Sequence, residues 1–154
     1  MSPPLFELIC RSGDSAARQQ EARFRIIVAT AWGLLTPATR RTLRKANCRL
    51  YLADLVFPKG QAGMTAYYLP RHRLVVVNAY SLAKMSSLAA VTVLVHELFH
   101  AWAHARRLPY YKNENKIDRL TEEVGLPMQQ VRAFVTGRGK DPGRPSVCAR
   151  TSSR

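Results

Sequence analysis

The sequence has 154 residues, 47% of them apolar, so it can bury one core of ordinary domain size. Three widely spaced cysteines, Cys10, Cys48 and Cys148, exclude a disulfide framework and a cysteine zinc site. The longest apolar run, residues 88–95, is too short to span a membrane, and the N-terminus lacks a secretory signal, so we expect a cytoplasmic protein.

The charge is strongly positive, at +14 with a pI near 10.6. Such an excess predicts a polyanionic partner, such as nucleic acid or an anionic membrane surface. The alternative is compositional bias, because most of the basic residues are arginine. Both interpretations stay open at this point.

In the first half of the chain, the pattern predicts two helices followed by strands. Residues 15–34 fit an amphipathic helix, and Thr36 with Pro37 is typical of the cap and first position of a second, basic helix. Apolar alternation then favours a strand over residues 48–56. Two β-rich runs, 64–69 and 73–78, bracket a turn and predict a hairpin.

The second half predicts helices. Residues 81–107 lack glycine and proline, so we expect one long helix that Pro109 stops. A further helix, capped by Asn113 or Asn115, ends at Gly125, and another follows over 127–135. We therefore expect one α+β domain over residues 1–135, with a basic, disordered tail over 136–154.

The long helix contains the pattern His-Glu-x-x-His at residues 96–100. Residues four apart lie on one helix face, so His96 and His100 can share one zinc ion (Zn²⁺). Glu97 beside them can take a proton from water whose pKa the metal lowers. A chance match in this composition is expected about 0.007 times, and the competing interpretation is a pair of buried core histidines.

A zinc hydrolase needs a third protein ligand and one open position. His104 lies about 12 Å along the axis from His96, too far to share the ion. If Ile117, Leu120 and Val124 face the motif helix, the glutamates that flank this stripe are candidates. We expect Glu123, then Glu114, and a small rotation would bring in Glu122.

HELFHAW at 96–102 followed by LTEEVG at 120–125 resembles gluzincin-type metallopeptidases, closest in pattern to DA1-type domains. The upstream segments RLVVVNAYSL and LAAVTVLVHE also resemble SprT-like and ImmA/IrrE-like zincins, so the likeness covers roughly residues 64–135. It implies His96 and His100 as zinc ligands, Glu97 as general base and a glutamate of the 122–123 pair as third ligand. Here Val124 separates this pair from Gly125, and no histidine occurs downstream of His104.

A different class of function also fits the sequence. Residues 117–134 match a helix-turn-helix template with Gly125 at the turn, and Gln129, Gln130 and Arg132 could reach base edges. That alternative is a DNA-binding protein in which any zinc is structural.

We expect the first function, a zinc-dependent hydrolase acting on proteins or peptides. Its zincin-like domain would pack a small sheet on the motif helix, and an edge strand would align the substrate.

Overall fold

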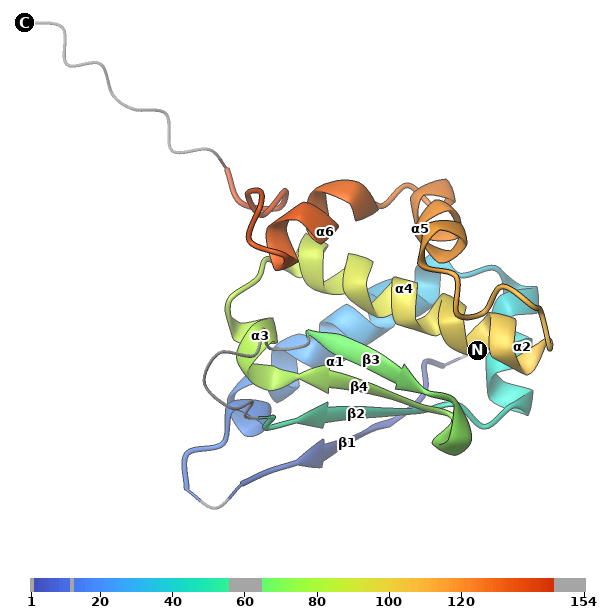
Figure 1. The fold of residues 1–154 in the computed structure, drawn as a ribbon. Coiled ribbons are helices and arrows are strands. Elements are labelled where there is room, and N and C mark those ends of the chain that lie inside the picture. Colours follow the sequence, from blue (N-terminus) through green and yellow to red (C-terminus); the bar gives the residue numbers. More distant parts are fainter. Residues whose placement is uncertain (1, 12, 56–64, 146–154) are drawn as a thin grey trace, which may run out of the picture.

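The computed structural model describes residues 2–11, 13–55 and 65–145, and its fold is mixed α+β, as predicted (Figure 1). Helices α1 and α4 cover one face of a four-stranded sheet, and α5 and α6 lie over α4. The elements are β1 (Phe6–Ile9), α1 (Ala16–Leu34), α2 (Pro37–Lys45), β2 (Arg49–Ala53), β3 (Ala66–Leu69), the 3-10 turn η1 (Pro70–His72), β4 (Leu74–Asn78), α3 (Ala79–Ala83), α4 (Ser87–Ala105), α5 (Glu114–Glu123) and α6 (Met128–Val135).

The sheet has the strand order β1-β2-β4-β3. β1, β2 and β4 are parallel, and β3 pairs antiparallel with β4 as the predicted hairpin. β1 was not predicted, because its four residues alternate only between partly exposed and exposed positions. β3 is an edge strand of the described sheet, and this leaves one side of its backbone unpaired beside the site described below.

The core lies between the sheet and the two long helices. Phe24 and Ile27 of α1, Leu52 of β2 and Leu94 of α4 are 0–1% exposed. Burying each such side chain contributes about 1.5–3 kcal/mol of transfer free energy. This packing holds α4 rigidly over the sheet, and α4 carries the His-Glu-x-x-His pattern.

The prediction of one helix over residues 81–107 is wrong at its start. Ser86 interrupts the run by capping α4, since its side chain accepts a hydrogen bond from the Ala89 backbone N–H. Buried Asp141 reinforces the break, because its carboxylate accepts hydrogen bonds from the backbone and the hydroxyl of Ser86. Asp141 is 55 residues away from Ser86, so this reinforcing contact cannot be predicted from a local pattern.

Part of the tail that was predicted to be disordered packs against the domain through Asp141. Residues 136–145 return to the start of α4, where Asp141 is 6% exposed. Residues 146–154, the rest of this predicted tail, lie outside the described residues. Residues 56–64, which include the end of one predicted strand and the start of the next, also lie outside them. None of the described helices combines the length and the apolar character that crossing a bilayer requires.

Candidate metal centre

The middle of α4 brings two imidazoles together. His96 and His100 lie one helical turn apart, are 5% and 7% exposed, and place their Nε2 atoms 3.0 Å from each other. The helix is apolar around most of its circumference because α1, the sheet and α5 all pack against it. Two histidines in such surroundings need polar partners.

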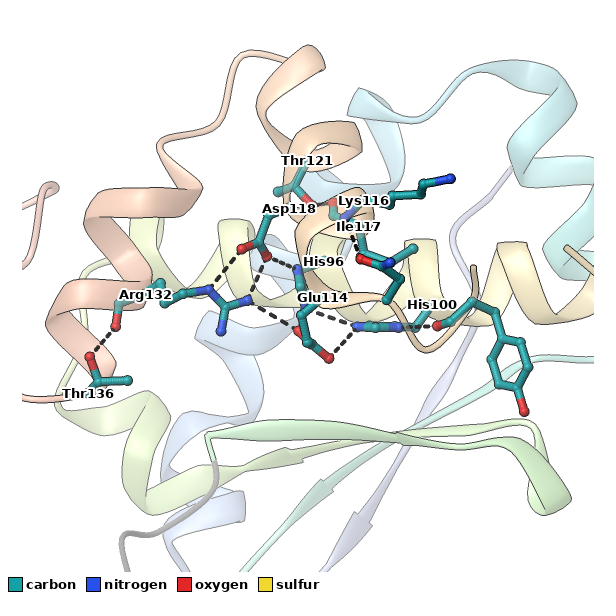
Figure 2. Close-up of polar contacts among 11 residues, drawn as sticks. His96, His100, Glu114, Lys116, Ile117, Asp118, Thr121, Arg132 and Thr136 are labelled. Atoms are coloured by element: carbon teal, nitrogen blue, oxygen red, sulfur yellow. Dashed lines mark hydrogen bonds and ion pairs between the residues drawn. The ribbon is translucent and has the colours of Figure 1, made fainter. Parts of the chain in front are cut away.

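The first turn of α5 supplies the third group (Figure 2). Asn113 caps this helix, so Glu114 is its first residue and points back at α4. Its two carboxylate oxygens lie 3.0 Å from His96 Nε2 and 3.1 Å from His100 Nε2. His96, His100 and Glu114 thus form a group that could hold a metal ion.

Polar contacts on the far side of each ring orient the lone pairs toward this point. His100 Nδ1 donates to the Tyr111 carbonyl, which leaves the Nε2 lone pair of the neutral ring free. His96 Nδ1 lies 3.1 Å from an Asp118 oxygen, a contact close enough for a hydrogen bond but not aligned as one. A carboxylate there favours a proton on Nδ1, and so a lone pair on Nε2.

Two nitrogen lone pairs and a carboxylate therefore converge on one point, and they repel each other unless a cation lies between them. A tetrahedral zinc ion with bonds of about 2.0–2.1 Å would hold its ligand atoms about 3.3 Å apart. The separations here are 3.0–3.1 Å. Both the donor types and their spacing fit zinc, although other divalent ions also accept this set.

Without a metal ion, the pKa values of His100 and Glu114 are shifted in the directions that reduce this repulsion. Burial opposes a charge on His100, but hydrogen bonds to Glu114 and to the Tyr111 carbonyl outweigh it and raise the pKa of His100. The same contacts with His100 and His96 hold the pKa of Glu114 far below its usual range. These shifts favour a positive charge on His100 and a negative charge on Glu114 where no metal is bound.

Asp118 and Arg132 support the ligands from behind. Asp118 lies one turn after Glu114 on α5 and is 2% exposed. Arg132, on α6, donates to both Asp118 oxygens, at 2.8 and 2.6 Å, and to Glu114 at 3.2 Å (Figure 2). This bidentate pair fixes two acidic side chains at once and ties α6 to the site.

Glu97 lines a cleft of about 730 Å³ in front of the histidines. Burial, the largest influence, raises the pKa of Glu97, and the neighbouring histidines only partly oppose it. The cleft is bounded by β3, α4 and α6, with mostly apolar and aromatic walls; its lining includes Thr65, Ala66, Tyr67, Tyr68, Val93, Tyr111, Lys112, Met128, Arg132 and Val135.

The structure brings together His96, His100 and Glu97 as the sequence suggests, but Glu114 rather than Glu123 joins them. Glu123 is exposed at the last residue of α5, nine residues and therefore about half a rotation away from Glu114. The buried residues of α5 are Ile117, as predicted, together with Asp118 and Thr121, whereas the other two predicted residues, Leu120 and Val124, are only partly buried against the core. Glu122 is exposed as well.

Asp118 is absent from the predicted site residues because a carboxylate does not belong to the apolar stripe that hydrophobic periodicity identifies. One signal for it does exist, since the i, i+4 spacing of Glu114 and Asp118 repeats that of the two histidines. His104, judged too distant, forms a hydrogen bond of 2.8 Å with the Tyr68 hydroxyl, which lies on β3. Arg132, assigned to base contacts in the helix-turn-helix alternative, is bound to Asp118 instead.

Comparison with known proteins gives no match: no family model fits the sequence, and no curated protein or solved structure is similar to the chain. The case for a function therefore depends on the geometry of the site.

Proposed function

We propose that this chain is a zinc-dependent hydrolase, most simply a peptidase, with zinc held by His96, His100 and Glu114. The observation that carries the proposal is the convergence of these three donors, with Glu97 next to them in an open cleft. A purely structural zinc site would have four protein ligands and no access. Glu123, the third ligand favoured from the sequence, is replaced by Glu114 in this proposal.

Bound zinc would supply Lewis acidity toward a substrate carbonyl and lower the pKa of water. In the metal-free site burial raises the pKa of Glu97, so its carboxylate accepts a proton more readily than an exposed glutamate does. Glu97 would take the proton as the water oxygen attacks the carbonyl carbon, and would then pass this proton to the departing amine nitrogen as the C–N bond breaks. The products are a carboxylic acid and an amine, so the reaction is balanced.

Two features favour a peptide over another hydrolysable substrate. The cleft runs along β3, whose outer edge is unpaired in the described sheet and can hydrogen bond with an extended chain. Its walls are mainly apolar and aromatic, which suits side chains next to the scissile bond. Arg132 and Tyr111 also line the cleft and can donate to a developing oxyanion.

The test combines metal content with activity. Zinc is measured in wild type, Glu114→Gln and the matched variant Glu123→Gln, all dialysed together. We expect one zinc per chain in wild type and Glu123→Gln, and loss in Glu114→Gln. A mixture of quenched fluorescent peptides then compares wild type with Glu97→Gln, which should keep its zinc and lose hydrolysis. Absence of zinc from folded wild type would refute the metal site, whereas bound zinc without cleavage would refute the peptidase step alone.

A further inference from the structure

The end of α2, the turn of the β3–β4 hairpin and the end of α4 lie at one end of the molecule (Figure 1), and each of these segments carries arginine or lysine residues. We call this surface the basic pole. All eight of its cations are exposed: Arg41, Arg44, Lys45, Arg49, Arg71, Arg73, Arg106 and Arg107.

Hydrogen bonds join the segments that build the basic pole. Arg73 donates from its guanidinium to the Ala46 carbonyl at 3.0 Å, and its own carbonyl accepts from the Arg49 backbone at 2.9 Å. The Tyr68–His104 bond of 2.8 Å ties the hairpin to the last turn of α4. Three stretches that are far apart in the sequence are thereby held in one place by the fold.

These cations have no acidic partners among the described residues, since no ion pair within 4.0 Å includes any of the eight. The chain has only ten acidic residues, and several are committed elsewhere. Asp54 and Asp141 accept hydrogen bonds at helix starts, while Glu114 and Asp118 serve the metal centre. The charge of the pole is therefore uncompensated.

Several of the guanidinium groups are positioned in advance by aromatic rings. Arg44 lies 5.6 Å from the centre of the Trp32 ring, Arg106 lies 5.6 Å from Trp102, and Arg49 lies 5.8 Å from Tyr51. Stacking uses the flat face of a guanidinium and leaves N–H donors at its edge for an anion. Two N–H donors at the edge of one guanidinium can bind two oxygens of one phosphate. Guanidinium groups held in place by stacking therefore favour a phosphate group over an anionic surface whose charge is diffuse.

We propose that the basic pole binds the phosphate backbone of a nucleic acid. The surface differs from the helix-turn-helix alternative, because it uses neither α5 nor α6. It is also independent of the proposed hydrolase, since it contains no residue of the metal centre. If about five of the eight cations neutralise phosphates, the logarithm of the association constant should fall linearly with the logarithm of the salt concentration. The expected slope is about −3.5 for a single strand and about −4.5 for a duplex.

The test is fluorescence anisotropy with a labelled RNA strand and a labelled DNA duplex of about 20 nucleotides or base pairs, between about 50 and 200 mM KCl. The pole variant is Arg41→Gln with Arg71→Gln and Arg107→Gln, one from each segment. The control removes three exposed cations elsewhere, Arg18→Gln with Lys84→Gln and Lys140→Gln. Circular dichroism checks that each variant folds.

We expect the pole variant to bind at least tenfold more weakly at about 100 mM KCl, with a slope shallower by about 2, and the control to stay within about threefold of wild type. Single variants, which carry less risk of misfolding, should each reduce the slope by about 0.7 for the single strand and about 0.9 for the duplex. Binding should persist in EDTA and in Glu97→Gln. Equal loss in pole and control variants would overturn the proposal, as would binding to phosphatidylserine vesicles without binding to either nucleic acid.

Discussion

Replacing Asp118 by Asn tests how the metal centre is supported. Asp118 contacts His96 Nδ1 at 3.1 Å and receives two hydrogen bonds from Arg132, yet it does not itself reach the metal position. Asparagine keeps the shape of the side chain but removes its charge. The ring of His96 then loses the carboxylate that favours a proton on Nδ1, and Arg132 loses its bidentate partner.

Two separate losses are expected. Substitution of a partner behind a ligand histidine typically weakens metal binding 10- to 100-fold, or about 1.4–2.8 kcal/mol. Hydrogen bonds to charged groups contribute about 1.5–3 kcal/mol, but the Arg132 side chain is 37% exposed and solvent screens the pair. We therefore expect the metal-free protein to lose about 1–2 kcal/mol of unfolding free energy.

The assay is zinc competition against a chromogenic chelator, together with urea unfolding in EDTA. Glu123→Gln removes the same charge from the exposed side of the same helix and controls for long-range electrostatics. Zinc affinity within twofold of wild type in Asp118→Asn, alongside lower metal-free stability, would refute the reasoning and leave Asp118 as a structural partner of Arg132 alone.

Three further predictions follow from individual contacts. Because the pKa of His100 is raised in the folded protein, its contribution to metal-free stability is complete below its unfolded pKa and is lost as pH rises through the folded value. Urea unfolding in EDTA should show this fall in unfolding free energy, and His100→Gln should make the pH dependence flatter. His104→Gln should keep one zinc per chain by elemental analysis, since His104 forms a hydrogen bond with Tyr68, and loss of zinc from the folded variant would show that His104 is a zinc ligand after all. Asp141→Ala should lower the unfolding free energy by about 1–3 kcal/mol at neutral pH, because Ser86 loses its acceptor; a change below 0.5 kcal/mol in urea unfolding would show that the contact with α4 is dispensable.

Local patterns were sufficient where structure depends on neighbouring residues. The helices at 16–34, 37–45, 114–123 and 128–135 begin and end close to their predicted positions, because caps such as Thr36 and Asn113 act within one turn. The hairpin was also predicted correctly. The break at Ser86 was missed although its cap is local, and the contact with Asp141 that reinforces it is distant in sequence.

The sequence by itself determined the chemistry that is possible here, because the i, i+4 spacing of His96 and His100 follows from helix geometry alone. Only the tertiary structure decided which carboxylate meets them. The rotation of α5 buries Ile117 together with Asp118 and Thr121, and hydrophobic periodicity places the charged Asp118 away from the predicted stripe. The partners that make their burial favourable, Arg132 from another helix and the Ile117 carbonyl one turn before Thr121, become visible only once the chain has folded.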